Sequence, residues 1–399
     1  MNVSSDFEVP IRRSADVLLL PAWYLPIGGE FCREQAWHLN RNSIRADILA
    51  TISLPWRKHP FKLLTDSWRD KQTNDDGIFI YSRFHRPIPM CDEPNIKRWS
   101  QAVVDLFERY VSCEGMPRLI HAHSSTWAGY AASLIKEKYG IPYIITEHRG
   151  IFGMRSQLAV RSFKSFYAPY LQKAFDNSSR IIAVSGQLLP KIESFLSHEV
   201  PMEVLSNIVD TNFFLPKKRN HEKLKFRFIA VNGYWDVKGY DVLVPAFDSL
   251  CDRFSQVELV LVGPNFNHPE FQRLLRKCRH QDAIHFTGTL SSMGVRNELY
   301  SADALVISSR VEAQSISVLE ALSTGIPVVC TDPIPEYVVG EGQGIRVPVE
   351  DVEALTEAMF QMVLTVNDYN PYKLFEHVKS IASPGHVVNR LKEIYSCFL

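Results

Sequence analysis

Short apolar runs rich in branched residues alternate with amphipathic helical patterns, and this alternation occurs twice along the chain. Such an alternation is typical of parallel β-sheets whose two faces are covered by helices. The strands expected in the first half are Asp16–Leu20, Arg118–His121, Tyr143–Thr146 and Arg180–Val184. Those expected in the second half are Phe226–Val231, Val257–Val262, Ala283–Phe286, Ala304–Ser308 and Pro327–Cys330. The sequence therefore predicts an α/β protein with two doubly wound, Rossmann-like domains that face a deep cleft.

A polar stretch divides the two alternations. Residues 206–225 contain Pro216 and a run of basic side chains, without the apolar spacing of a strand or helix. A chain of 399 residues also exceeds what one hydrophobic core usually serves. We therefore expect an N-terminal, acceptor-binding domain at 1–205, a connection at 206–225 and a second, nucleotide-binding domain at 226–375. The remaining residues, 376–399, are expected to form a helix that packs back on the first domain.

The composition argues against several classes of protein. The 44 Lys and Arg residues balance 44 Asp and Glu residues, which does not favour a nucleic-acid-binding protein. The seven cysteines include no CxxC pair, so neither a zinc nor a disulfide framework is expected. No apolar run approaches the roughly 18 residues that cross a membrane, and the N-terminal apolar run is too short for a signal peptide. We expect a cytoplasmic protein.

Residues 308–329 carry the strongest candidate site. Their sequence, SSRVEAQSISVLEALSTGIPVV, predicts a strand end, a loop, a helix and a second strand. Glu312 lies in the loop, where the free N–H groups and dipole of the following helix suit phosphate and hydroxyl oxygens. Glu320 lies one turn into the helix and is placed to bind a diol. Alternatively, Ser317 and Glu320 form a capping box, in which Glu320 serves only its own helix.

Two glycine-containing loops also follow predicted strands. In residues 231–247, Lys238 precedes Gly239 and a helix that Asp241 is expected to cap. A lysine in that loop suits a diphosphate as a point charge, and the alternative is a solvated lysine before a helix. The pair Gly28 and Gly29 lets the backbone approach a phosphate closely, although paired glycines are also common in ordinary turns.

Histidines follow two other predicted strands. His121 and His123 end one strand, and Glu147 and His148 end the next. Strand ends of neighbouring βα units reach the same cleft. The pattern lacks a convincing third ligand and helical spacing, so no metal site is expected. We expect His121 to be structural, and His123 and His148 to contact a sugar or phosphate.

With these segments in place, the chain resembles the family 4 retaining glycosyltransferases, which have the GT-B fold. The Glu-x7-Glu pair and LEALSTGIPVV are its most specific part, and SNIVDTNFF, KGYDVLVPAF, VELVLVGP, IHFTGTL and LYSADALVISSR occur in the family's usual order. The N-terminal segments PAWYLPIGGEFCREQAWHL and HAHSSTWAGYAASLIKEKYGIPYIITEH resemble bacterial members that build exopolysaccharide or lipopolysaccharide. The resemblance covers nearly the whole chain.

The resemblance implies a metal-independent transfer of a hexose from a UDP-, GDP- or ADP-sugar to a glycan or a polyprenyl- or lipid-linked acceptor, with no further cofactor. Glu312 would meet the hydroxyls of the donor sugar, Lys238 its diphosphate, and His148 would lie near the same sugar as the third catalytic residue. The leaving phosphate would help to deprotonate the acceptor hydroxyl on the same face. The substrate-binding residues implied are Gly28, Gly29, His123, Thr289, Leu290, Ala313, Gln314, Ser315, Ile316, Ser317 and Glu320.

Each part of this set has an implied place on the donor. Gly28 and Gly29 would approach the diphosphate, Glu320 would bind the ribose, and Thr289 with Leu290 would flank the base. Two features depart from the family pattern. Gly233 stands where the family commonly has an arginine that clamps the diphosphate, and Arg310 is a candidate to replace it. The loop AQSIS at 313–317 replaces the common Gly-Phe-Gly wording and would change which sugar is accepted.

Two other functions remain open. A sugar-nucleotide epimerase of the same fold would bind a similar donor and need acid/base carboxylates at C2 of the sugar, but no acceptor. A non-catalytic carbohydrate- or lipid-binding relative would keep the fold without transfer. Nucleotide release that depends on an acceptor separates the first from a transferase, and donor hydrolysis or transfer excludes the second.

Peripheral contact with the cytoplasmic membrane face is testable directly. Residues 55–64 (PWRKHPFKLL) and 154–175 combine basic and aromatic side chains, and basic groups near an anionic leaflet contribute about 1 kcal/mol each. The protein should float with anionic liposomes at low salt, as a lipid-linked acceptor requires. If it stays in the soluble fraction, the aromatic side chains belong to the core and the acceptor is a soluble glycan or small molecule.

Overall fold

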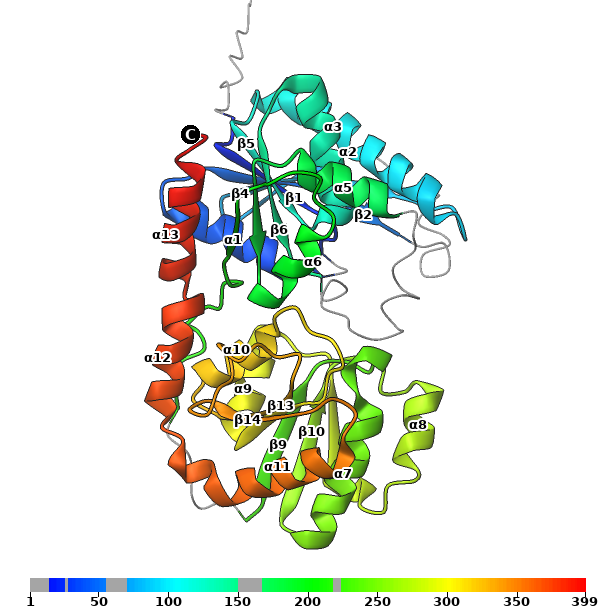
Figure 1. Ribbon diagram of the computed structural model, residues 1–399, viewed down its shortest axis with the longest axis vertical. Coiled ribbons are helices and arrows are strands. Elements are labelled where there is room, and N and C mark those ends of the chain that lie inside the picture. Colours follow the sequence, from blue (N-terminus) through cyan, green and yellow to red (C-terminus); the bar gives the residue numbers. More distant parts are fainter. Residues whose placement is uncertain (1–13, 26–27, 55–69, 150–166, 218–223) are drawn as a thin grey trace, which may run out of the picture.

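The computed structural model describes residues 14–25, 28–54, 70–149, 167–217 and 224–399, and it shows two α/β domains, one above the other in Figure 1. The elements of the first domain are β1 (Val17–Pro21), α1 (Glu30–Arg41), β2 (Ala46–Ser53), β3 (Lys71–Asp75), β4 (Ile78–His85), α2 (Asp92–Glu114), β5 (Leu119–His123), α3 (Tyr130–Tyr139), β6 (Tyr143–Glu147), α5 (Ala168–Asp176), β7 (Arg180–Ala183), α6 (Leu189–Glu193) and β8 (Met202–Val204). Those of the second are β9 (Phe226–Val231), α7 (Tyr240–Arg253), β10 (Val257–Val262), α8 (Pro269–Leu275), β11 (Ile284–Gly288), α9 (Ser292–Ser301), β12 (Ala304–Ile307), α10 (Ile316–Ser323), β13 (Val328–Thr331), β14 (Gly344–Val347) and α11 (Val352–Thr365).

Each domain is built on one sheet. The first sheet has the order β3-β4-β2-β1-β5-β6-β7-β8 and the second has the order β11-β10-β9-β12-β13-β14. All pairs are parallel except β3 and β4, which form an antiparallel pair at one edge. The turn between those two strands is Asp76-Gly77, and both residues have the positive φ angles that a tight hairpin needs. The predicted α/β fold with two parallel sheets is confirmed.

Helices cover both faces of each sheet, which explains why the central strands are apolar along their whole length. Helices α2, α3 and α5 pack on one face of the first sheet and α1 on the other. Helices α7, α8 and α11 pack on one face of the second sheet, and α9 and α10 on the other. Strands β1 and β5 are buried at every position, so the polar loops that carry function must lie at the strand ends.

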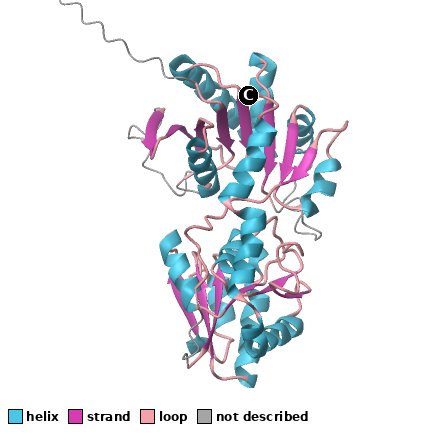
Figure 2. Ribbon diagram, turned by 90° about the vertical axis from the view of Figure 1, so that its left-hand side faces the viewer, coloured by secondary structure: helices cyan, strands magenta, loops and turns pink. Residues whose placement is uncertain are grey.

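The last two helices, α12 (Pro371–Ala382) and α13 (Pro384–Tyr395), run along one side of both domains (Figures 1 and 2). Leu374 and Val378 of α12 belong to the core of the second domain. Leu391 and Tyr395 of α13 belong to the core of the first domain. Within the expected helix at 376–399, the part that packs on the first domain therefore begins at Pro384. No helix among the described residues is long and apolar enough to cross a membrane.

The strands expected from sequence match β1, β5, β6, β7 and β9 to β13 within two residues at each end. The expectation omitted β2, β3, β4, β8 and β14, and also α2, α5 and α6. Buried polar side chains interrupt the apolar pattern in two of these elements. In β2, Asp47 is buried and accepts a hydrogen bond from the Tyr110 hydroxyl at 3.0 Å. In α2, Asn95 and Glu114 are buried.

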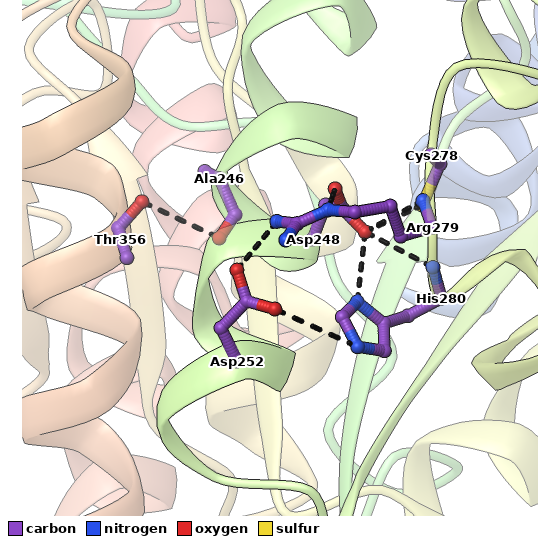
Figure 3. A network of polar contacts seen from close by, with 7 residues as sticks. All are labelled: Ala246, Asp248, Asp252, Cys278, Arg279, His280 and Thr356. Atoms are coloured by element: carbon purple, nitrogen blue, oxygen red, sulfur yellow. Dashed lines mark hydrogen bonds and ion pairs between the residues drawn. The ribbon is translucent and has the colours of Figure 1, made fainter.

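A buried carboxylate in α7 binds the loop between α8 and β11 and holds that loop against the helix (Figure 3). Asp248 accepts hydrogen bonds from the backbone N–H groups of Arg279 (2.9 Å) and His280 (3.0 Å) and from the Cys278 thiol (3.3 Å). The His280 Nδ1 lies 2.9 Å from the same carboxylate. Asp252, one turn later, pairs with Arg279. Burial alone would raise the pKa of Asp248, but hydrogen bonds from His280, Cys278 and Arg279 lower it to about 2.

This network predicts a stability effect with a defined pH range. Because the pKa of Asp248 lies below its ordinary value of 3.8, the ionised carboxylate stabilises the fold above that pH, and the stabilisation is lost as the pH falls toward about 2. Asp248→Asn should lower the free energy of unfolding at pH 7 by about 2 kcal/mol in urea denaturation. The difference should shrink between pH 4.5 and 3. Asp252→Asn, at a more exposed position, is the matched control, and an equal loss in both variants would contradict the assignment.

Candidate functional site

The strand order reverses once in each sheet, between β1 and β5 and between β9 and β12. Ligands of open α/β sheets bind at the carboxyl ends of the strands beside such a reversal. The loops that leave these four strands span residues 22–29, 124–129, 232–239 and 308–315. The two loops of the second domain contain Lys238 and Glu312, and the first loop contains Gly28 and Gly29.

Lys238 and Glu312, which come from separate motifs, form an ion pair beside the reversal in the second sheet. Lys238 Nζ lies 2.6 Å from Glu312 Oε1, and the Ser309 hydroxyl donates to the same oxygen at 2.9 Å. The Gln187 side chain, from the first domain, donates to the backbone carbonyl of Glu312 at 2.9 Å. The pair therefore lies where the two domains meet, and an anionic ligand would compete with Glu312 for the Lys238 amino group.

Two of these loops require glycine. Gly239 has a φ of 66°, and a Cβ atom there would lie 2.0 Å from the Ser308 carbonyl oxygen. Gly29 has a φ of 91°, and its Cβ atom would lie 2.5 Å from the Trp23 carbonyl oxygen. Neither position accepts a side chain unless the backbone moves. The approach of the Gly28 and Gly29 backbone to a diphosphate stays a prediction.

The structure explains why an arginine is absent at position 233. A Cβ atom on Gly233 would lie 2.7 Å from both the ring and the carbonyl oxygen of Pro264, and that carbonyl accepts a hydrogen bond from the Tyr234 N–H at 3.0 Å. A larger residue would thus displace the loop after β10. The position where the family places its second diphosphate cation is closed.

Arg310 is paired with other groups, and its replacement of that arginine stays a prediction. Its guanidinium pairs with Asp241 (2.6 Å) and Glu350 (2.9 Å) and donates to the Asp236 carbonyl at 2.6 Å. Asp241 therefore binds Arg310 and does not cap α7, whose N-cap is Gly239. Arg310 fixes the loop that carries Lys238.

Three histidine rings stack behind the carboxyl ends of β5 and β6. His121 stacks on His123 with ring centroids 4.4 Å apart, and His123 stacks on His148 at 5.2 Å. A hydrogen bond of 2.9 Å joins His123 Nδ1 to His148 Nε2. Burial lowers the pKa of all three, to about 3 for His121 and His148, so the rings are neutral at physiological pH. His148 therefore brings no positive charge to the site, and its contact with a sugar stays a prediction.

The structural role predicted for His121 follows from its partners. Gln35 Nε2 donates to His121 Nδ1 at 3.1 Å, which places the ring proton on Nε2, where it donates to the Thr146 hydroxyl at 2.6 Å. The Tyr395 hydroxyl also donates to Nδ1, at 2.6 Å. Both nitrogens of His121 are thus satisfied by protein groups.

Glu147, the carboxylate beside His148, is also fully hydrogen-bonded within the protein. One oxygen accepts from the Ser124 hydroxyl (3.0 Å) and the Arg149 N–H (2.9 Å), and the other accepts from the Ser125 N–H (2.8 Å) and hydroxyl (2.5 Å). Four donors fill a fully buried carboxylate. Glu147 and the histidines therefore do not converge on one point, and no group of three metal-ligating side chains occurs within the described ranges.

Glu320 faces the first domain. The helix that carries it begins at Ile316 with Ser315 as its N-cap, so the capping-box interpretation of Ser317 and Glu320 is wrong. Burial, and next the charge of Glu34 on α1, raise the pKa of Glu320 to about 8. Burial, then Asp210, raise the pKa of Glu34 itself to about 7. These two carboxyl groups approach each other across the domain boundary, and the implied contact of Glu320 with a ribose stays a prediction.

The loop 313–317 is tied to the rest of the protein by Gln314, a contact that sequence reasoning did not foresee. Gln314 Oε1 accepts from the Asn207 N–H (2.8 Å) and side chain (3.0 Å), and its amide donates to the Ser206 hydroxyl (2.8 Å) and to Tyr337 (3.3 Å). A hydrogen bond of 3.0 Å joins the hydroxyl groups of Ser315 and Ser317. Ala313, Gln314 and Ser315 are buried, whereas Ile316 and Ser317 are partly exposed. Because its amide is already bonded, Gln314 orients the loop.

Thr289 and Leu290 follow β11, at the far edge of the second sheet. Thr289 is exposed and Leu290 is partly buried against the core. They lie at the same carboxyl edge of the sheet as Lys238 and Glu312, in agreement with an elongated ligand laid along that edge, but their contact with a base stays a prediction.

A cavity of about 730 Å³ opens beside Glu312, between the two domains. This volume is in the range of small-molecule sites. The first domain contributes residues that follow β7, namely Gly186, Gln187, Pro190 and Lys191. The second domain contributes Arg310, Glu312, Asp332, Pro333, Pro335, Glu336, Tyr337, Arg346 and Val349.

Family models match both halves of the chain. The model described as "Glycosyltransferase Family 4" matches residues 52–213, and that described as "Glycosyl transferases group 1" matches residues 225–364. The chain is 26% identical over 360 residues to the putative teichuronic acid biosynthesis glycosyltransferase TuaC of Bacillus subtilis. That alignment covers 85% of this chain and 86% of the relative.

Solved structures share the fold over nearly the whole chain. Sucrose-phosphate synthase from Thermosynechococcus elongatus aligns with a TM-score of 0.79 at 16% identity, over 96% of this chain and 98% of that one. HepE of Anabaena, in complex with UDP and glucose, aligns with a TM-score of 0.71 at 14% identity, over 96% and 99% of the two chains. These similarities confirm the GT-B fold that the sequence predicted.

The pKa of Glu320 predicts a pH effect on stability. Because this carboxyl group is more easily protonated in the folded state, it stabilises the fold fully below its ordinary pKa of 4.5, and the stabilisation is lost as the pH rises through about 8. Between pH 6 and 9 the free energy of unfolding should fall by about 2–3 kcal/mol through this group. Glu320→Gln should flatten the fall, measured by urea denaturation at both pH values. Glu341→Gln, at an exposed position, is the control, and parallel curves for all three proteins would refute the assignment.

Proposed function

Because this chain belongs to glycosyltransferase family 4, we propose that it transfers a hexose, with retention of configuration, from a nucleotide diphosphate sugar to a glycan or lipid-linked acceptor. The observation that carries the proposal is the Lys238–Glu312 pair beside an interdomain cavity of about 730 Å³. The complex of HepE with UDP and glucose makes UDP-sugars the first donors to test. The name of the relative TuaC favours an acceptor in cell-surface polysaccharide synthesis.

Lys238 supplies the positive charge for the leaving diphosphate. Negative charge grows on the diphosphate in the transition state, and a preorganised cation and N–H donors stabilise it there. Within the described part of the chain, no side chain caps the first N–H groups of α10, which lie just after Glu312. A diphosphate that takes Lys238 from Glu312 would free that carboxylate to accept hydrogen bonds from the hydroxyls of the donor sugar. Since Lys238 and α10 supply charge, we propose that no divalent metal is needed.

Retention is proposed to follow a front-face route. A double displacement would need a free carboxylate beside the anomeric carbon. Glu147 is filled by four donors. Glu312, once the diphosphate has taken Lys238, would be occupied by the hydroxyls of the donor sugar and by the Ser309 hydroxyl. In the front-face route the leaving phosphate oxygen accepts the proton of the acceptor hydroxyl on the side where that hydroxyl attacks. The neutral His148 would hold a hydroxyl of the donor sugar during this step.

The proposed location is cytoplasmic, with peripheral contact to the membrane where a lipid-linked acceptor is presented. The basic and aromatic stretch at 55–64 lies outside the described residues, as does most of the stretch at 154–175. The contact therefore rests on sequence and on the flotation test.

Donor binding and transfer test the proposal. A nucleotide sugar present at 100 times its dissociation constant should stabilise the protein by about 2.7 kcal/mol, so UDP-, GDP- and ADP-sugars can be ranked by thermal shift. With the preferred donor, Lys238→Met should reduce the turnover number by roughly 10²- to 10³-fold. Lys373→Met, an exposed residue on α12, is the matched control.

Three outcomes of the same assay bear on the mechanism. Nucleotide release should depend on the acceptor, and acceptor-independent conversion of the donor sugar would identify an epimerase. NMR of the product should show the anomeric configuration of the donor, and inversion would refute the front-face route. Activity should survive EDTA, and complete loss restored by manganese would refute metal independence.

A further inference from the structure

A second cavity, of about 200 Å³, lies at the carboxyl edge of the first sheet. Three tryptophans, Trp23, Trp99 and Trp127, line it together with Ala22, Ser53, Thr126 and Arg149. These residues follow β1, β5 and β6, end β2 or come from α2. The lining thus combines three indole rings with the polar side chains of Ser53, Thr126 and Arg149. Aromatic walls with a small number of placed polar groups are usual in small-molecule sites. Flat indole faces suit the apolar faces of a sugar ring, so the cavity can hold one ring of a glycan.

The tryptophan walls are held rigidly. The Trp99 indole N–H donates to the Thr51 carbonyl at 3.1 Å, and Trp127 packs edge-on against Trp99 with ring centroids 5.8 Å apart. Trp127 has a φ of 74° and ψ of −66°, a conformation that costs energy for a residue with a side chain. The buried Glu147 carboxylate maintains it by binding Ser124 and Ser125 just before it. The cavity is therefore preorganised.

Arg149 brings an unneutralised charge to this aromatic cavity. Its backbone N–H is held by Glu147, which directs the residue to the cavity wall. Its guanidinium makes no hydrogen bond or ion pair with any residue that the structure describes. Arginine binds carboxylates and phosphates through two parallel hydrogen bonds, with more geometric specificity than lysine. A ligand of this cavity that bears an anion would therefore be favoured over its neutral counterpart.

The cavity is adjacent to the residues proposed to hold the donor sugar. Trp23, which lines it, packs edge-on against His148 with ring centroids 6.5 Å apart. The Gly28 and Gly29 backbone lies against the same tryptophan: a Cβ atom on Gly28 would be 3.5 Å from its ring. A ring in the cavity would thus lie on the acceptor side of His148.

We propose that this cavity, formed by Trp23, Trp99, Trp127 and Arg149, is an acceptor subsite for an anionic sugar, one that carries a carboxylate or a phosphate within reach of Arg149. The inference rests on the proposed transferase function and adds to it the chemical class of the acceptor. The partly exposed indoles of Trp23 and Trp127 hold the ring, the buried Trp99 supports Trp127, and Arg149 selects for the charge of the ring.

Calorimetric titration of the full chain tests the proposal with three matched probes: methyl β-glucoside, methyl β-glucuronide and methyl β-glucoside 6-phosphate. At least one anionic probe should bind about tenfold or more tightly than the neutral glucoside, as expected for a charge-assisted hydrogen-bond pair. Preference for the glucuronide alone identifies a carboxylate acceptor, and preference for the phosphate alone identifies a phosphorylated one. Equal affinity for all three probes, or tighter binding of the glucoside, would overturn the proposal.

Variants separate the contribution of the indole rings to binding from that of the Arg149 charge. Arg149→Met should remove the anion preference and leave the affinity for the glucoside within about twofold, whereas Trp127→Phe should weaken all three probes. Arg118→Met removes one positive charge at the opposite edge of the sheet and should keep the preference. If Arg149→Met keeps it too, the inference is wrong. Thermal shift with nucleotide sugars on the same preparations tests the transferase proposal separately, because donor binding does not use this cavity.

Discussion

The position of the cleft depends on helix α13, which packs back on the first sheet at the C-terminal end of the chain. The hydroxyl of Tyr395 on α13 donates a hydrogen bond to His121 on β5, and this contact is fully buried. Helix α13 covers the face of the first sheet beside α1. Helix α12 belongs to the core of the second domain, and only Ser383 separates the two helices. These two helices therefore bridge the two cores across a single residue, and they act together with the contacts of Gln187 and Gln314 in setting how the carboxyl edges face each other.

The contact between Tyr395 and His121 is connected to the candidate site by a stack of three histidine rings. His121 is held by Tyr395, Gln35 and Thr146, His123 stacks on it, and His148 stacks on His123. Because burial lowers the pKa of each ring, the stack carries no charge at physiological pH and needs no counter-ion. His148 is thus positioned by the C-terminal helix as well as by the strands.

The sequence predicted what local patterns determine. Apolar strands followed by helices placed Lys238 and Glu312 at strand ends, and parallel topology made those ends meet. Contacts between distant segments were not predictable in this way. The bonds from Gln314 to Ser206 and Asn207 join positions more than 100 residues apart, and no spacing within one segment reports them.

Capping was misjudged for a related reason. Ser317 and Glu320 have the spacing of a capping box, but α10 starts earlier, at Ile316, and Glu320 instead lies near Glu34 of the other domain. The role of Arg310 was likewise undetermined until Asp241 and Glu350 were seen beside it. In each case the sequence identifies a polar residue near the site, and the tertiary contact decides its partner.

The close approach of Gly233 to Pro264 has a consequence for how such proteins diversify. With a Cβ atom at 233 only 2.7 Å from Pro264, no single substitution installs the missing arginine without moving the second loop. Because one of the two contacts is with the Pro264 carbonyl oxygen, replacing Pro264 alone would not make room for a side chain at 233. A cation at this position therefore requires a shift of the backbone after β10, so position 233 cannot change independently of that loop.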